Sequence, residues 1–214
     1  MNKVLLLDFD GVIFKNKGAL QIVSNKAARF VKNNVKLSNK DSHIVNKYLY
    51  KSFGHTLYGL NNLGYNINIK DYNDYVYKNI NYKYFIINKS DVKDIKVIIE
   101  RCKKYNIKIY IFSNSPKCWC DNILDCMNID KNNMRYIDTM NLLKPDKELY
   151  DKIEKENQDS KIYFVDDSFI NFKHTLLNPK WKNIMFDTKK IHIESNINLK
   201  IINNLYDIIY ILDE

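Results

Sequence analysis

The fold is decided by the stretch Val4-Leu5-Leu6-Leu7-Asp8-Phe9-Asp10-Gly11-Val12, near the start of the 214-residue chain. A short apolar run that is bounded by a glycine turn is typical of a strand buried on both faces of a parallel sheet. Two carboxylates, Asp8 and Asp10, follow this run two residues apart. Because residues i and i+2 of an extended chain project to the same side, we expect both acids at the carboxyl end of the strand.

The residues after 88 alternate between strand patterns and helix patterns. Further strands are predicted at 107–112, 161–165 and 183–186. Helices are predicted to begin near Ser90, near Pro116 and after Lys144-Pro145-Asp146, and a last amphipathic helix is predicted at about 199–212. Strand–helix alternation implies a parallel sheet that is covered by helices on both faces. The predicted fold class is therefore α/β, with a Rossmann-like three-layer core.

A helical segment interrupts this alternation directly after the first strand. From about residue 19 to residue 74 the apolar residues recur at helical spacing, with Gly54, Gly59 and Gly64 between shorter helices. An insertion at this place would lie above the carboxyl edge of the sheet as a cap. We predict a catalytic core made of residues 1–14 plus 89–214 and a small helical cap domain at 15–88.

The net charge of +9 is concentrated in the predicted cap. Residues 15–88 hold 12 Lys or Arg against 3 Asp and no Glu, so the remainder of the chain is balanced. A basic segment attracts anions, either phosphorylated metabolites or nucleic acid. A solvated lysine-rich surface explains the composition equally well.

Composition and cysteine spacing restrict the class of protein. A hydrophobic content of 45% excludes a disordered chain. The four cysteines, Cys102, Cys118, Cys120 and Cys126, lack the C-x-x-C pairs of a zinc site, so free thiols in a reducing compartment are expected. Without a signal-peptide core or a stretch of membrane-spanning length, the sequence predicts a cytoplasmic protein with no membrane partner. It does not indicate an oligomeric state.

Polar residues follow three of the predicted strands. They are Asp8 with Asp10, Ser113 with Asn114, and Asp166 with Asp167. In an open parallel sheet the ligand site lies beyond the carboxyl ends of the strands. A group of buried like charges is unfavourable, and a hard divalent cation with oxygen ligands would compensate it. The sequence therefore predicts a Mg²⁺ site.

Phosphoryl transfer is the chemistry that these residue types suit. Asp8 can attack phosphorus, and Asp10 can protonate the leaving alcohol and later deprotonate water. Ser113 and Asn114 are assigned to substrate binding, with hydrogen-bond donors for the phosphoryl oxygens. Lys144 would supply a positive charge both to those oxygens and to the carboxylates. Each feature is weak alone, and their joint occurrence at strand ends favours a site.

The motifs resemble those of the haloacid dehalogenase (HAD)-like hydrolase superfamily. The four matching segments are Asp8-Phe9-Asp10-Gly11-Val12, Ile111-Phe112-Ser113-Asn114, Lys144 of Lys144-Pro145-Asp146, and Phe164-Val165-Asp166-Asp167-Ser168. The resemblance implies a HAD core with a C1-type helical cap and Mg²⁺-dependent phosphatase activity. It implies Asp8 as nucleophile and metal ligand, Asp10 as a ligand through its backbone carbonyl, and Asp166 and Asp167 as the acids that complete the site.

A second resemblance lies in the cap. The segment Tyr50-Lys51-Ser52-Phe53-Gly54-His55-Thr56-Leu57-Tyr58-Gly59-Leu60 is similar to the cap of fungal, plant and bacterial pyrimidine 5′-nucleotidases. The similarity implies nucleoside 5′-monophosphates as substrates. His55 and Tyr58 could contact a sugar or base, although packing is the preferred interpretation of both.

Four alternatives remain open at this stage. The substrate could be another small phosphometabolite, or a phosphorylated polynucleotide end, which the basic cap suggests but the absence of a nucleic-acid module disfavours. A dehalogenase of the same fold is disfavoured by Asp10. The last alternative is a catalytically idle binding protein that keeps the fold.

Overall fold

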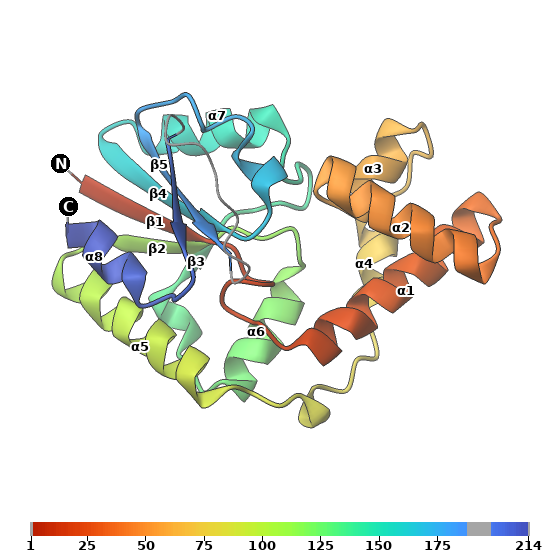
Figure 1. Cartoon of the computed structure of the whole chain (residues 1–214), viewed down its shortest axis with the longest axis horizontal. Coiled ribbons are helices and arrows are strands. Elements are labelled where there is room, and N and C mark those ends of the chain that lie inside the picture. The colour runs from red at the N-terminus through yellow and green to blue at the C-terminus, as the bar shows by residue number, and fades with distance from the viewer. Residues whose placement is uncertain (1, 188–197, 214) are drawn as a thin grey trace.

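The computed structural model describes residues 2–187 and 198–213. Within them, six parallel strands form one sheet in the order β3-β2-β1-β4-β5-β6 (Figure 1). The strands are β1 (Asn2–Leu7), β2 (Lys108–Ile111), β3 (Arg135–Tyr136), β4 (Ser160–Asp166), β5 (Trp181–Phe186) and β6 (Leu199–Ile202). The strand that leads into Asp8 is therefore central, and it pairs with β2 on one side and β4 on the other.

Helices cover both faces of the sheet, and a separate group of helices stands beside it. The helices of the described chain are α1 (Lys17–Val35), α2 (Asn39–Phe53), α3 (Thr56–Asn62), α4 (Ile69–Tyr77), α5 (Lys89–Lys104), α6 (Lys117–Cys126), α7 (Lys147–Glu156) and α8 (Asp207–Asp213), with the 3-10 turns η1 (Tyr82–Tyr84), η2 (Lys131–Asn133) and η3 (Phe169–Phe172). Figure 1 shows α5, α6 and α8 on one side of the sheet and α7 on the other. The predicted α/β class with a three-layer core is confirmed.

The apolar run of β1 is buried from both sides. Successive residues of a strand point to opposite faces. Leu5 and Leu7 pack into the hydrophobic cluster that includes α5, α6 and α8, whereas Val4 and Leu6 pack into the cluster that includes α7. All four are at most 1% exposed. Burial on both faces explains why this strand reads as a continuous apolar run rather than an alternating one.

The C-terminal part of the chain corrects one prediction. Instead of a helix over 199–212, Leu199–Ile202 forms the edge strand β6 and only Asp207–Asp213 is helical. The apolar residues of both elements happen to recur at three-to-four spacing, which imitates one amphipathic helix. Hydrogen bonding of β6 to β5 overrides that local pattern. The two-residue strand β3 was not predicted either, because it is too short to produce a sequence pattern.

The helices α1 to α4, here called the cap, stand to one side of the core at the end of β1 where the chain leaves the sheet (Figure 1). In it α1 packs against α2 and α4, and α2 packs against α3. Gly59 permits the last contact, because a Cβ atom there would come within 2.8 Å of Leu49 Cδ2. The domain division at 14/15 and 88/89 stays a prediction, and residues 188–197 of the predicted core lie outside the described residues.

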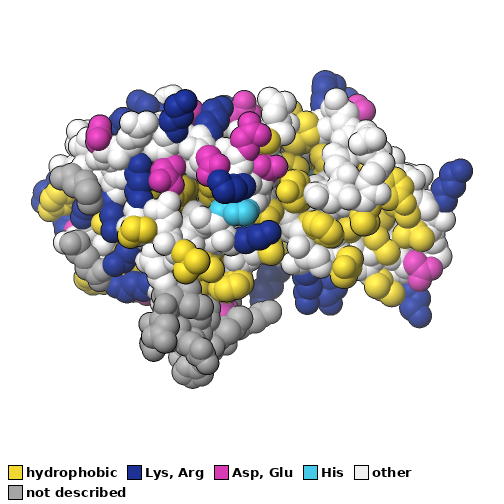
Figure 2. All heavy atoms as spheres, turned by 90° about the horizontal axis from the view of Figure 1, so that it is seen from above, with side chains coloured by type: hydrophobic (Ala, Val, Ile, Leu, Met, Phe, Trp, Pro, Cys, Tyr) yellow, Lys and Arg dark blue, Asp and Glu magenta, His cyan; other side chains and the backbone are white. Residues whose placement is uncertain are grey.

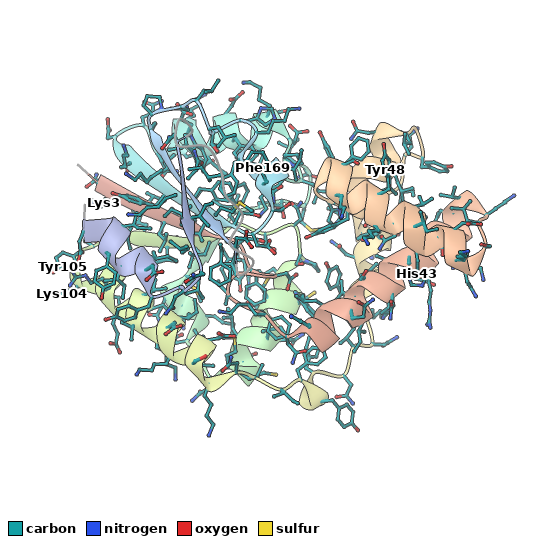
Figure 3. All side chains as sticks on the ribbon, viewed as in Figure 1. Lys3, His43, Tyr48, Lys104, Tyr105 and Phe169 are labelled. Atoms are coloured by element: carbon teal, nitrogen blue, oxygen red, sulfur yellow. The ribbon has the colours of Figure 1, made fainter. Side chains whose placement is uncertain are left out.

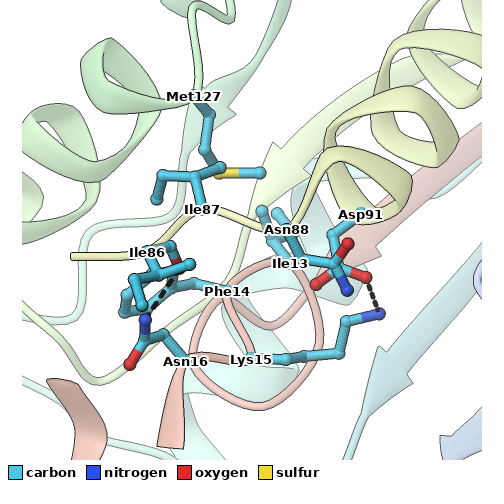
Figure 4. A pocket seen from close by; sticks show the side chains of 9 residues that line it. All are labelled: Ile13, Phe14, Lys15, Asn16, Ile86, Ile87, Asn88, Asp91 and Met127. Atoms are coloured by element: carbon cyan, nitrogen blue, oxygen red, sulfur yellow. Dashed lines mark hydrogen bonds and ion pairs between the residues drawn. The ribbon is translucent and has the colours of Figure 1, made fainter. Parts of the chain in front are cut away.

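The two chain segments that join the cap to the core are bonded to each other. Lys15 forms a 2.8 Å ion pair with Asp91, and Asn16 Nδ2 donates to the backbone oxygen of Ile86 at 2.7 Å (Figure 4). Asn16 also begins α1, because its side-chain oxygen accepts from the backbone N–H of Ala19. A pocket of about 270 Å³ lies between the segments. The outgoing and returning chains are thus held side by side at the base of the cap.

The surface of the cap carries exposed apolar side chains. Figure 2 shows hydrophobic side chains over the cap, with lysine and arginine side chains set apart from one another at its margins on this face. His43 and Tyr48 lie exposed on α2, whereas Phe169 of η3 lies where the core approaches α2 (Figure 3).

All four cysteines are free thiols, as expected. Among the described residues, no helix combines the length and apolarity needed to cross a membrane.

His55, which precedes α3, is a buried histidine of the cap, and its burial should make the stability of the protein depend on pH. It is 5% exposed, packs edge-on against Tyr72, and neither ring nitrogen has a hydrogen-bond partner among the described residues. Burial lowers the pKa of His55 from 6.5 to about 4. Between these values the unfolded chain binds more protons than the folded one, so the contribution of His55 to stability is lost as the pH falls below about 6.5.

We therefore expect the difference in unfolding free energy between the wild type and His55→Phe to change by about 2 kcal/mol between pH 7 and pH 5, in favour of the variant at the lower pH. Urea denaturation at the two pH values measures it. The exposed His43→Phe is the matched control and should show no such change. A pH-independent difference for His55→Phe would contradict a buried neutral imidazole.

Candidate active site

A buried ion-pair network lies at the carboxyl end of the central strands. Lys144 Nζ donates to Asp8 Oδ1 at 3.0 Å and to Asp166 Oδ2 at 2.6 Å. Asp8 follows β1, Asp166 ends β4, and Lys144 comes from the loop before α7. Lys144 is 1% exposed and Asp166 is 0% exposed, so this lysine is held entirely within the protein. The structure thus brings together two of the predicted acids and the predicted lysine.

Two asparagines fix the network in place. The Asn114 side chain pairs with the backbone of Lys144, accepting from its N–H at 2.7 Å and donating to its carbonyl at 2.9 Å. Asn171 Nδ2 donates to both carboxylate oxygens of Asp166 at 2.9 Å. Asn114 was predicted to bind substrate, and here its amide orients the lysine. Asn171 was not predicted, and its place five residues after Asp166 is the signal that could have indicated it.

Asp167 completes a group of three acids. Oxygens of Asp8, Asp166 and Asp167 lie within 4.8 Å of one another. Gly11 allows this approach, because a Cβ atom at its position would come within 2.2 Å of Asp167 Oδ2. Its φ of +90° is also a conformation that L side chains rarely adopt. The glycine of the first motif therefore makes room for the acid of the fourth.

Burial and mutual repulsion raise the pKa values of Asp8 and Asp167. Burial, and then the charges of Asp166 and Asp10 against the opposing effect of Lys144, raise the pKa of Asp8 to about 7. Withdrawal from bulk water, followed by the charges of Asp8 and Asp166, raises the pKa of Asp167 to about 8, although part of this residue remains exposed to solvent. Burial opposes the charge on Lys144, but Asp166 and Asp8 outweigh it and raise the pKa of the lysine.

These residues fit a divalent cation. Three carboxyl groups lie beside one ammonium group, and within the described part of the chain no other cationic side chain pairs with them. When all three are ionised, two negative charges are left over, and a doubly charged ion would balance them. All available ligand atoms are carboxylate oxygens, which are the donors that Mg²⁺ prefers. Asp8 and Asp167 are the acids best placed to hold it, because both oxygens of Asp166 are already bonded to Lys144 and Asn171.

Asp10 lies apart from this group and has partners of its own. Its Oδ1 accepts from Trp119 Nε1 at 3.0 Å, and its Oδ2 accepts from Ser115 Oγ at 2.5 Å. Burial raises the pKa of Asp10 even though both hydrogen bonds favour the charged form. Neither Ser115 nor Trp119 was singled out in the sequence. The only signal for them was their place just after the Ser113-Asn114 motif.

Ser113 follows β2 and lines a second pocket. It is 6% exposed, its hydroxyl oxygen accepts from the backbone N–H of Ser115 at 3.2 Å, and its carbonyl accepts from Thr139 Oγ1. Ser113 and Ser115 line a pocket of about 220 Å³ together with Lys117 and Met140. The Asn73 side chain of α4 approaches Met140 from the cap. Ser113 is therefore placed between the acids and a space that a substrate could enter.

The cap segment that resembles nucleotidases contacts the core beside the partner of Asp166. Desolvation, followed by the charges of Asp167 and Asp8, raises the pKa of Tyr50 well above its usual value, although 49% of this residue remains exposed. Gly54 ends α2 in a left-handed conformation against Asn171 and Pro145 of the core. A Cβ atom on Gly54 would come within 3.0 Å of Asn171 Oδ1. The end of α2 thus closes one side of the site.

Solved structures share this architecture along their whole length. A HAD phosphatase from Thermococcus onnurineus superposes with a TM-score of 0.57 at 12% identity, over 98% of this chain and 97% of that one. YfnB of Bacillus subtilis, assigned to the HAD hydrolases and solved with bound magnesium, gives 0.59 at 13% identity over 100% and 99%. The chain has the HAD fold.

A third structure of the HAD fold is a predicted phosphoglycolate phosphatase from Haemophilus somnus, with a TM-score of 0.57 at 15% identity over 99% of this chain and 98% of that one. The cap is included in these superpositions, because nearly the whole of each chain is covered. No protein-family model and no curated protein sequence matches the chain. The similarity therefore concerns the fold, because at these sequence identities a shared fold does not establish a shared function.

Removing the ammonium group of Lys144 from the ion-pair network should destabilise the protein. Lys144→Met leaves Asp8 and Asp166 as uncompensated buried charges, which typically costs about 3–5 kcal/mol and should lower the Tm by roughly 10 °C. Since Mg²⁺ would take over part of the lost positive charge, its addition should raise the Tm of the variant more than that of the wild type. Thermal unfolding with and without Mg²⁺ measures both effects.

Lys147→Met is the matched control for this experiment. Lys147 lies three residues away, is exposed, and pairs with Asp151 one turn along α7. Exposed pairs of this kind contribute little, so the control should change stability by no more than about 0.5 kcal/mol. Equal Tm values for Lys144→Met and Lys147→Met would show that the buried network does not hold the core together.

Proposed function

We propose that this chain is a Mg²⁺-dependent phosphomonoesterase that forms a covalent aspartyl phosphate on Asp8. The observation that carries the proposal is the setting of Asp8, whose carboxylate is bonded to a buried lysine and lies beside two further acids at the carboxyl ends of the central strands. The HAD fold, which phosphatases share, raises the prior for this chemistry but does not establish it.

The residues of the chain divide the reaction between them. Lys144 holds Asp8 Oδ1, and we assign the attack on phosphorus to Oδ2. The new O–P bond forms as the bond to the leaving oxygen breaks, and Asp10 gives that oxygen a proton. In the second half, Asp10 takes a proton from water, and the water oxygen displaces Asp8 from phosphorus. Ser113 donates to the phosphoryl oxygens. When bound, Mg²⁺ neutralises charge on the transferring phosphoryl group.

We infer that the substrate is a nucleoside 5′-monophosphate. The support is the nucleotidase-like segment from Tyr50 to Leu60, whose Gly54 lies against Asn171, the hydrogen-bond partner of Asp166. The pocket of about 220 Å³ beside Ser113 offers space for a leaving group of limited size. Another small phosphometabolite is the second candidate, because the pocket would admit it as well.

The polynucleotide end and the idle binding protein are less well supported. On the face that Figure 2 shows, the basic side chains of the cap are separated rather than gathered into a track for a phosphate backbone. Asp8, Lys144 and Asp167 lie together and Asp10 is held by hydrogen bonds nearby, an arrangement that an idle protein would not require. A screen of nucleotides, sugar phosphates and phosphorylated oligonucleotides distinguishes all of these, and strong inhibition by salt would favour the oligonucleotide.

Replacing the nucleophile gives the central test. Asp8→Asn should lower phosphate release by about 10³-fold or more, because an amide oxygen does not form the covalent intermediate. Acid-quenched wild-type enzyme should yield a phosphorylated peptide that contains Asp8, and the variant should not. The exposed Asp151→Asn is the control and should keep full activity. Comparable turnover by Asp8→Asn and wild type would exclude the covalent route.

Metal dependence is tested separately. Excess EDTA should remove phosphatase activity, and added Mg²⁺ should restore it, because the acids of the site otherwise repel the phosphate group. Asp167→Asn should raise the Mg²⁺ concentration required for half-maximal activity, since it removes one ligand charge. Full activity in EDTA would refute the metal assignment.

A further inference from the structure

The orientation of Asp10 is set by two donors that both come from one short stretch after β2. Trp119 Nε1 bonds one carboxylate oxygen and Ser115 Oγ bonds the other. A carboxylate that is held at both oxygens cannot rotate about its χ angles without breaking a hydrogen bond in a poorly solvated place. The direction in which Asp10 presents a proton therefore depends on how Ser115 and Trp119 are themselves held.

Both of these donors are held by one residue of the cap. The Tyr77 hydroxyl lies 3.0 Å from Ser115 Oγ. Because the Ser115 proton is directed to Asp10, the serine oxygen is left to accept the proton of the tyrosine. The Tyr77 ring also packs against the Trp119 indole, with 5.5 Å between the ring centroids. Tyr77 is the last residue of α4 and is 7% exposed, so its place is fixed by packing.

The indole is enclosed by further rings from the two segments that join cap and core. Phe14 lies in the outgoing segment, and Tyr82 and Phe85 lie in the returning one. Their centroids are 5.7 to 5.9 Å from that of Trp119. Trp119 is 0% exposed within this cage. Its N–H thus has one fixed direction, which is toward Asp10.

We propose that Tyr77 is a positioning residue for the reaction, which sets the orientation of Asp10 from the cap through Ser115 and Trp119. This inference rests on the proposed phosphatase function, in which Asp10 is the acid that protonates the leaving group. Tyr77 touches neither Asp8 nor the other metal-binding acids through any hydrogen bond in the described chain. Its effect is therefore confined to the proton transfers of Asp10, which are the protonation of the leaving oxygen and the later deprotonation of water.

Because Tyr77 acts only through Asp10, a comparison of two leaving groups that differ in their need for a proton can detect its role. A strongly basic alkoxide leaves only if it is protonated, whereas p-nitrophenolate leaves without help. A misdirected Asp10 should thus slow the phosphorylation of Asp8 by alkyl phosphates and leave its phosphorylation by p-nitrophenyl phosphate almost unchanged. The attack of water on the aspartyl phosphate is common to both substrates, so the comparison uses kcat/KM, which reports the first step alone. A general loss of structure would slow both substrates alike.

The main variant is Tyr77→Phe, which removes one hydroxyl and keeps the ring. We expect kcat/KM for an alkyl phosphate to fall by about 10-fold or more and kcat/KM for p-nitrophenyl phosphate to fall by less than about 3-fold. Tyr82→Phe is the matched control. It removes a hydroxyl from another ring of the same cage, but that hydroxyl bonds Asn122 and not Ser115. It should leave both rates unchanged.

A double variant tests the route through Ser115. If Tyr77 acts on Asp10 through the serine, Ser115→Ala with Tyr77→Phe should lose no more alkyl phosphatase activity than Ser115→Ala alone. An equal loss on both substrates, no loss in Tyr77→Phe, or fully additive losses would each overturn the proposal. These outcomes require an active wild type, so a wild-type enzyme without activity on any phosphomonoester would instead refute the proposed function.

Discussion

The burial of Lys144 is the constraint around which the core is arranged. An ammonium group inside a protein is tolerated only if its charge is compensated and its donors are used, and Asp8 and Asp166 accept two hydrogen bonds from it at the ends of two neighbouring strands. The amide of Asn114 bonds the backbone of the lysine, and the amide of Asn171 bonds Asp166. The segments that follow β1, β2 and β4 are therefore all linked, directly or through one further group, to Lys144. A ligand that binds at this edge of the sheet therefore meets side chains that are already held in place.

Two acids that are close in the sequence have separate environments. Asp8 lies among like charges and one cation, while Asp10 lies between an indole and a hydroxyl. Their surroundings differ because Asp8 is bonded to Lys144, whereas Asp10 is bonded to Ser115 and Trp119. A motif of three residues thereby serves two regions of the site. One region belongs to the core, and the other extends to the cap.

The sequence allowed the sheet-edge part of this site to be predicted, because strand ends and helix starts follow from local patterns. Asp8 and Asp166 were identified at strand ends and Lys144 before a helix, and the structure brings the three together. Asn171 and Trp119 were missed, because their contacts with the acids are tertiary and leave no local pattern in the sequence. The edge strand β6 was mistaken for helix for a related reason, since its pairing with β5 is a tertiary effect that four residues cannot signal.

The cage around Trp119 has a practical consequence. The molecule has two tryptophans, and the other, Trp181, is buried on β5 among rings of the opposite cluster. Trp119 alone is in contact with rings from both connecting segments and with the last residue of α4. Its fluorescence emission is therefore a natural spectroscopic reporter of the joint between the two parts, available without any attached dye. A Trp181→Phe background would isolate that signal for stopped-flow observation of ligand entry.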